Sequence, residues 1–168
     1  MHPLSPFPHF YPILDAAFFP DRTALLAAAE ELRAAGVELL QYRNKRGSAR
    51  QILGDAEGLK SAVGQSVRLI MNDRADLCLA AGFDGLHVGQ EDLSPDGARR
   101  VLGPDLWVGV STHNPEQLQE ADASAADYVA IGPVFATSTK QRPDPVVGLE
   151  GVRRARERTR KPLVAIGG

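Results

Sequence analysis

The sequence predicts an α/β fold, a TIM-type (β/α)8 barrel that is truncated in this chain after its seventh strand. Short apolar runs alternate with helical patterns along all 168 residues, and such alternation indicates a parallel sheet covered by helices. Polar and charged residues gather directly after the apolar runs, where a barrel places its chemistry. No Gly-x-Gly-x-x-Gly motif follows an early strand, so an open dinucleotide-binding sheet has little support.

The expected elements cover the whole chain, which is interpreted as one barrel domain spanning residues 1–168. Strands are expected at residues 10–14, 37–42, 68–71, 85–88, 106–110, 128–131 and 163–166. Helices are expected at 23–35, 48–63, 74–81 and 149–158, with two more that begin near residues 95 and 115. These two begin at Ser94-Pro95 and Asn114-Pro115, where a capping side chain precedes a proline at the first helical position.

The composition limits the class of function. A formal net charge of −2 provides no field suited to nucleic acid or to an anionic membrane surface. Cys78 is the single cysteine, so no internal disulfide can form and a reducing compartment is expected. Its place on the apolar stripe of a helix predicts a buried side chain. The first eight residues argue against a signal peptide and no stretch approaches the length of a membrane span, so we expect a cytoplasmic protein.

Polar side chains follow most of the expected strands. The residues that do so are Gln41, Tyr42, Arg43, Asn44 and Lys45, then Asn72 and Asp73, then Gln90, Glu91 and Asp92, then Ser111, then the loop 132–140, and finally Gly167 and Gly168. Alternation places Gln41, Arg43 and Lys45 on one side of an extended run, which makes a set of donors with two positive charges. If the strands form a barrel, these groups face a common cavity.

The charged members of this set predict a metal and a diphosphate. Asp73 and Asp92 come without a cluster of histidines or cysteines, and such carboxylates suit Mg²⁺ held by few protein ligands and by substrate phosphate oxygens. Arg43, Lys45 and Lys140 would then neutralise the rest of a diphosphate.

Each of these residues also has a structural interpretation. Asp73 precedes a helix and could be its N-cap, Asp92 could be a turn residue, and Ser94 is more typical of a helix cap than of a ligand. The cations after the second strand could be solvated charges, and residues 137–139 a polar loop. Taken together, the structural interpretations have less support than each has alone, because they must hold independently at five strand ends.

Other candidate sites have less support. Ser111 and His113 lack the second glycine of a nucleophile elbow and lie too close in sequence for a confident triad, so acyl transfer is disfavoured. His87 lies within a strand and is expected to be a hydrogen-bonded core histidine. The basic run at residues 153–161 is most simply a solvated helix face.

Six motifs in order resemble the thiamine phosphate synthase family. They lie at residues 41–45, 72–74, 88–93, 109–113, 131–140 and 166–168, and the similarity runs from about Tyr11 to the last residue. The resemblance implies that a thiazole ring nitrogen displaces diphosphate from a hydroxymethylpyrimidine diphosphate, giving thiamine phosphate. The aminopyrimidine ring would stabilise the cation formed when diphosphate leaves, so the protein needs no nucleophile.

The resemblance also implies roles for individual residues. The pyrimidine diphosphate would be held by Gln41, Tyr42, Arg43, Asn44, Lys45, Asn72, Ser111 and Lys140. The thiazole phosphate would be held by Thr137, Ser138, Thr139 and Gly168. Asp73 and Asp92 would bind Mg²⁺, and Arg43, Ser111 and Lys140 would be catalytic. The partners implied are these two small molecules, with neither nucleic acid nor membrane.

Two alternatives remain open at this point. A related branch with the same barrel isomerises a thiazole phosphate, but its members tend to lack the full diphosphate set, which is complete here. The family also continues beyond Ile-Gly-Gly with a helix, an eighth strand and a final helix. In one hypothesis the protein is a working transferase, and the chain is a fragment, part of a homo-oligomer, or a barrel completed by another chain. In the other hypothesis the chain is a non-catalytic module that binds phosphate ligands.

Overall fold

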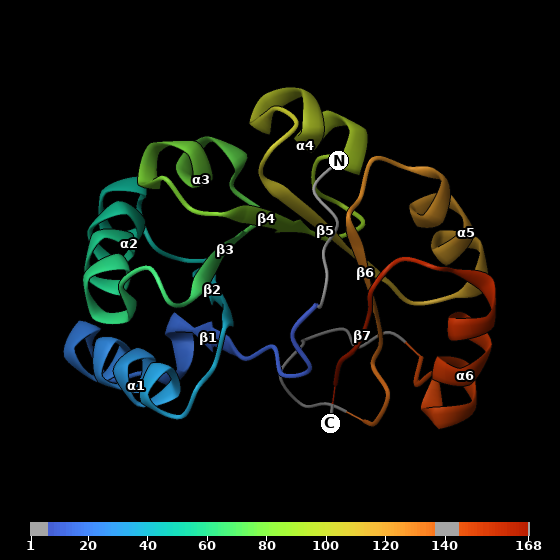
Figure 1. Cartoon of the computed structure of the whole chain (residues 1–168), viewed down its shortest axis with the longest axis horizontal. Coiled ribbons are helices and arrows are strands. Elements are labelled where there is room, and N and C mark those ends of the chain that lie inside the picture. The colour runs from blue at the N-terminus through green and yellow to red at the C-terminus, as the bar shows by residue number, and fades with distance from the viewer. Residues whose placement is uncertain (1–6, 137–144, 168) are drawn as a thin grey trace. The chain divides into compact units, whose positions relative to one another are not determined.

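The computed structural model describes residues 7–136 and 145–167, which form parallel strands alternating with helices (Figure 1). Seven strands and six α-helices lie in these ranges, in the predicted order. The chain divides into an N-terminal unit, Pro6–His87, and a C-terminal unit that begins at Val88. The helices of the described ranges are all too short or too polar to cross a membrane.

The N-terminal unit is a parallel sheet with strand order β1-β2-β3-β4. Its elements are β1 (Ile13–Asp15), the 3-10 turn η1 (Ala16–Phe18), α1 (Arg22–Ala34), β2 (Leu39–Arg43), α2 (Ala49–Val63), β3 (Arg68–Asn72), α3 (Ala75–Ala81) and β4 (Gly85–Val88). Leu14, Tyr42, Met71 and Leu86 are aligned across the four strands and are all buried. They face the helices, because the Tyr42 hydroxyl reaches α2.

Local chemistry explains where these elements begin and end. Ser48 and Gln51 form a capping box at the start of α2, in which each side chain accepts a hydrogen bond from the other's backbone N–H. Gly36, at φ +84°, ends α1, and the Val37 N–H donates to the Leu32 carbonyl at 3.0 Å. Val37 therefore completes the helix cap, and β2 begins two residues later than predicted.

The first strand also differs from its prediction of residues 10–14. It covers Ile13–Asp15, because Pro12 has no N–H to donate to a ladder. The Pro12 carbonyl still accepts a bond from the Gln41 N–H at 3.0 Å. The shift brings Asp15 into the strand, directly opposite Arg43.

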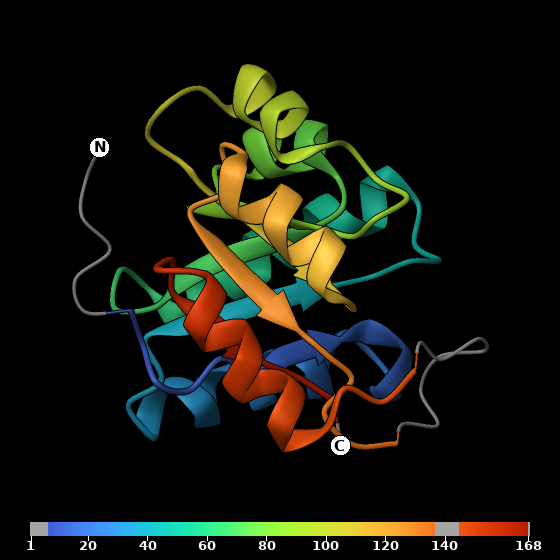
Figure 2. The same cartoon turned by 90° about the vertical axis from the view of Figure 1, so that its right-hand side faces the viewer.

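The C-terminal unit contains a second parallel set with order β5-β6-β7. Its elements are α4 (Pro95–Leu102), β5 (Trp107–Thr112), α5 (Pro115–Ala123), β6 (Tyr128–Ile131), α6 (Gly148–Arg158) and β7 (Leu163–Ala165). The predicted caps are confirmed: Ser94 accepts from the Gly97 N–H at 3.1 Å and Asn114 from the Gln117 N–H at 2.9 Å. Helices α5 and α6 lie on the same side of β6 (Figures 1 and 2).

An aspartate before β4 and another before β6 make the same contact. The Asp84 N–H donates to the Leu69 carbonyl at 2.9 Å, and its carboxylate accepts from the Leu69 N–H at 2.7 Å. Asp127 does the same with Val108, at 2.7 Å in both directions. Each carboxylate thereby fixes the register between its own strand and the preceding one.

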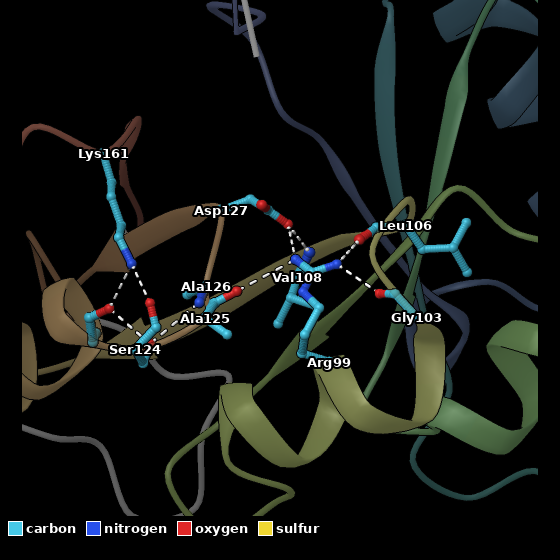
Figure 3. A network of polar contacts seen from close by, with 10 residues as sticks. Arg99, Gly103, Leu106, Val108, Ser124, Ala125, Ala126, Asp127 and Lys161 are labelled. Atoms are coloured by element: carbon cyan, nitrogen blue, oxygen red, sulfur yellow. Dashed lines mark hydrogen bonds and ion pairs between the residues drawn. The ribbon is translucent and has the colours of Figure 1, made fainter. Parts of the chain in front are cut away.

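Arg99 extends this contact in the C-terminal unit (Figure 3). Its guanidinium pairs with the Asp127 carboxylate and donates to the carbonyls of Gly103, at 3.0 Å, and Leu106, at 2.6 Å. One side chain from α4 thus ties together the start of β5 and the start of β6.

Replacing Asp127 with alanine should therefore destabilise the protein. The change removes the acceptor for the Val108 N–H and leaves the half-buried Arg99 without its carboxylate, at a cost of about 1–3 kcal/mol. Urea unfolding followed by circular dichroism measures this difference. Asp105→Ala is the control, since Asp105 is exposed in the turn before β5 and should change stability by less than about 0.5 kcal/mol. Equal effects of the two changes would contradict the assignment.

Candidate functional site

The end of β2 presents two of the predicted donors on the sheet face that is turned away from the helices. Ile13 is aligned with Gln41 and Asp15 with Arg43, and aligned residues of neighbouring strands point to the same face. Asn72 at the end of β3 is on this face too, because β3 is aligned with β2 through Gln41 and Ile70. The alternation read from the sequence therefore corresponds to a real face of the sheet.

Both donors at the end of β2 are held by the segment around β1. The Arg43 guanidinium forms an ion pair with the Asp15 carboxylate. The Gln41 side-chain amide donates to the Tyr11 hydroxyl at 2.9 Å, and Gln41 is only 2% exposed. Sequence reasoning missed Asp15 and Tyr11. The Asp15–Arg43 alignment could have signalled the pair, had the first strand been placed correctly.

Lys45 and Asp73 meet at the ends of β2 and β3. The Lys45 ammonium nitrogen lies 2.7 Å from a carboxylate oxygen of Asp73, and the two side chains are 49% and 19% exposed. A cation predicted to bind diphosphate and a carboxylate predicted to bind Mg²⁺ are therefore in direct contact.

The backbone at Asp73 adopts an uncommon conformation. Among the described residues it is the one non-glycine with positive φ, at +62°. The Arg74 N–H donates to the Asn72 carbonyl at 2.7 Å across it, and the Asp73 N–H donates to the His87 carbonyl at 2.8 Å. This is a γ-turn of the rare, strained kind. Such strain costs about 1–3 kcal/mol and is concentrated at functional sites.

The alternative role of Asp73 as a helix cap is wrong. Helix α3 begins at Ala75, and its N-cap residue is Arg74, whose side chain makes no capping hydrogen bond. The Arg74 guanidinium instead pairs with Asp76 in the first turn, at 2.6 Å. The Asp73 carboxylate is directed to Lys45.

Tyr42 and Asn44, to which the family resemblance assigns substrate binding, contact other residues of the protein. The buried Tyr42 hydroxyl donates to the Asp55 carboxylate of α2 at 2.6 Å and accepts from the Asn44 amide at 3.1 Å. The Asn44 side-chain oxygen accepts from the backbone N–H groups of Arg46 and Gly47. These contacts shape the loop after β2.

In the C-terminal unit, Asp92 closes a turn, and Ser111 lies inside β5, which continues to Thr112 and does not end at Val110 as predicted. An Asp92 carboxylate oxygen accepts from the Gly89 N–H at 2.8 Å, so the turn interpretation of Asp92 describes its present contact. The Ser111 carbonyl accepts from the Gln90 amide at 2.6 Å. Thr137, Ser138, Thr139, Lys140 and Gly168 lie outside the described residues.

Three further predicted residues occupy defined places. His87 is 6% exposed within β4, as expected for a core histidine. The Cys78 thiol is buried and donates to the Gly85 carbonyl at 3.1 Å, and burial raises its pKa to about 12. The His113 ring nitrogen Nδ1 lies 2.6 Å from the Gly132 carbonyl oxygen. The buried position predicted for Cys78 is confirmed.

The described residues hold no group of three or more histidine, cysteine, aspartate or glutamate side chains placed to bind a metal. A transition-metal centre made wholly by those residues therefore has no support. Asp73 offers a hard oxygen donor at a strand end, which fits a cation that takes few protein ligands and completes its shell with phosphate oxygens.

The strand ends and the sheet define the class of protein. Parallel strands covered by helices, with cationic and carboxylate side chains at the strand ends, are typical of an α/β-barrel protein. A solved thiamine phosphate pyrophosphorylase from Pyrococcus furiosus has the same fold, with a TM-score of 0.82 and 31% identity. The match covers 94% of this chain and 74% of that one.

The thiamine monophosphate synthase family matches residues 10–168, and the chain belongs to this family. Its curated relatives include the thiamine-phosphate synthase of Koribacter versatilis (strain Ellin345), which is 60% identical over 96% of this chain and 78% of that protein. The thiamine-phosphate synthase of Gloeobacter violaceus (strain ATCC 29082 / PCC 7421) is 47% identical, over 86% of this chain but 42% of that protein. The family is one of transferases in thiamine biosynthesis, and the chain is an enzyme of that class.

The buried Tyr42 predicts a loss of stability at alkaline pH. Burial, with a smaller effect of Asp55, raises the pKa of Tyr42 above its ordinary value of 10.0. The folded state therefore keeps a proton that the unfolded chain loses above about pH 10, and the free energy of unfolding falls as pH rises from there. Urea unfolding of the wild type and Tyr42→Phe at several pH values measures the two slopes. The substituted protein should show the flatter slope, and parallel curves would refute the assignment.

Proposed function

We propose that the strand-end residues of this chain carry out thiamine-phosphate synthesis by holding a diphosphate leaving group together with Mg²⁺. A thiazole nitrogen displaces that diphosphate from a hydroxymethylpyrimidine diphosphate, and thiamine phosphate and diphosphate are the products. Support comes from the family match and from relatives that are all named for this reaction. A cytoplasmic location belongs to the same proposal.

The contact between Lys45 and Asp73 is the observation that carries the proposal. A helix cap or a solvated charge would require no strained turn, whereas Asp73 adopts one and is directed to Lys45, in the loop that follows the neighbouring strand β2. Backbone strain of about 1–3 kcal/mol persists where the surrounding structure over-determines it. Here the turn directs a carboxylate toward an ammonium group at the adjacent strand ends, and this pairing supports a site for a metal and a diphosphate.

In this proposal the residues compensate the negative charge of the leaving diphosphate and align the two substrates. As the bond between the pyrimidine methylene carbon and oxygen breaks, negative charge develops on the departing diphosphate oxygen, and Arg43 and Lys45 would donate to this leaving group. Mg²⁺, held by Asp73 and Asp92 and by phosphate oxygens, would supply further positive charge to that group. Gln41 and Asn72 hold the pyrimidine on the same sheet face. The thiazole nitrogen is the nucleophile, so the protein contributes orientation in place of covalent catalysis.

The remaining assignments complete the site. Ser111 and Lys140 act at the pyrimidine diphosphate, while Thr137, Ser138, Thr139 and Gly168 hold the thiazole phosphate. Tyr42 and Asn44 act through the loop after β2, because their side chains contact α2 and the loop backbone. Two small-molecule substrates are the partners in this proposal, and a homo-oligomer or a second chain that completes the barrel is compatible with it.

Asp73→Asn should reduce turnover on the order of a hundred- to a thousandfold, the usual loss for one preorganised electrostatic group. The change keeps the size of the side chain but removes the negative charge that holds Lys45 and the metal. Formation of thiamine phosphate from both substrates and Mg²⁺ is the measurement, with thermal melting to verify folding.

Asp76→Asn is the matched control. Asp76 is three residues away, exposed, and paired with Arg74 on the surface of α3, so turnover should stay within a fewfold of the wild type. Wild-type turnover in Asp73→Asn would remove Asp73 from the site. If the unaltered protein forms no product at all, the non-catalytic phosphate-binding module becomes the better account.

A further inference from the structure

We infer that Asp15 is a positioning residue for this reaction, one that fixes the Arg43 guanidinium on the side where the diphosphate binds. The inference rests on the proposed function, because it assigns Arg43 to the leaving group. Asp15 lies in none of the six motifs that mark the family in the sequence.

The sheet places the two residues opposite each other. Asp15 is the last residue of β1, Arg43 is the last residue of β2, and the parallel register aligns them. Aligned residues share a face, so the Asp15 carboxylate and the Arg43 guanidinium meet beside the strand ends. They form a direct ion pair through the Nη1 nitrogen of Arg43 and the Oδ2 oxygen of Asp15.

Asp15 is itself held in place. Its Oδ1 oxygen accepts from the Ala17 N–H at 3.0 Å and caps η1. Both carboxylate oxygens are therefore engaged, one by the turn that follows β1 and one by Arg43. The Asp15 side chain is 15% exposed, so the pair is partly shielded from water, where charge-assisted hydrogen bonds are stronger.

The pair leaves Arg43 able to bind an anion. A guanidinium has five N–H donors arranged as a fork, and the contact with Asp15 is made through Nη1. The Arg43 side chain remains 31% exposed, so part of the fork can reach a ligand. A long flexible side chain that is already ordered loses less entropy when it binds a phosphate.

The segment around β1 also holds a second donor of β2, the side chain of Gln41. Tyr11, which precedes β1, accepts a hydrogen bond from the Gln41 amide at 2.9 Å. Gln41 and Arg43 alternate along β2, and Tyr11 and Asp15 contact them from residues 11–15. The segment that ends in β1 therefore acts as a support for the donors of β2.

Asp15→Asn tests the inference, since asparagine keeps an oxygen for the Ala17 cap but loses the charge that fixes Arg43. We expect kcat/KM to fall on the order of ten- to a hundredfold. The loss should appear in KM for the pyrimidine diphosphate and in weaker inhibition by inorganic diphosphate, while KM for the thiazole phosphate stays unchanged. A purely structural defect would not separate the two substrates.

The double variant Asp15→Asn/Arg43→Ala identifies the path of the effect. If Asp15 acts through Arg43, the double variant is no slower than Arg43→Ala alone. Asp21→Asn is the control, because Asp21 caps α1 by a contact of the same kind, from its carboxylate to the Ala24 N–H, and should leave both KM values unchanged.

Two results would overturn the inference while leaving the proposed function in place. One is full activity of Asp15→Asn when Arg43→Ala is slow. The other is a double variant whose loss of activity equals the full sum of the losses in the two single variants, expressed as free energies. Full activity in Arg43→Ala would overturn the inference together with the role proposed for Arg43 at the diphosphate. The three results are distinguishable in one set of assays.

Discussion

The register of the parallel strands β1, β2 and β3 is the constraint on which the proposed site depends. Side chains alternate along a strand, so a slip of one residue would exchange the two faces of the sheet. In the observed register Tyr42 faces α2 and is buried, while Gln41 and Arg43 face the other side. The hydrophobic contacts with the helices therefore also decide which groups are available to a ligand.

Charge balance at the strand ends follows from that register. Arg43 is paired with Asp15 at the end of β1, and Lys45 is paired with Asp73, directly after β3. Ion pairs that remain partly exposed to water, as these do, contribute modestly to stability. Their effect is to order long, flexible side chains before a ligand arrives, which lowers the entropic cost of binding. The strained turn at Asp73 has the same kind of effect, because it fixes the direction of the Asp73 carboxylate at a cost in stability.

Much of the fold could be predicted from the sequence, because local signals determine it. The capping side chains of Ser94 and Asn114 mark two helix starts, and apolar runs mark the strands. The site was less predictable. Asp15 was missed, because its partner is 28 residues away and the first strand predicted from the sequence ends at Leu14, one residue before it. The turn at Asp73 could not be predicted either, because an aspartate just before a helix is also the usual sequence pattern of a helix N-cap.

The central claim is that the strand ends bind diphosphate and Mg²⁺ as a unit. Isothermal titration of inorganic diphosphate into the protein, with and without Mg²⁺, tests it most directly. The account predicts binding that is strong with Mg²⁺ and weak without it, and Mg²⁺ affinity raised by diphosphate by the same factor. Diphosphate binding of equal strength in the presence and absence of Mg²⁺ would contradict the account.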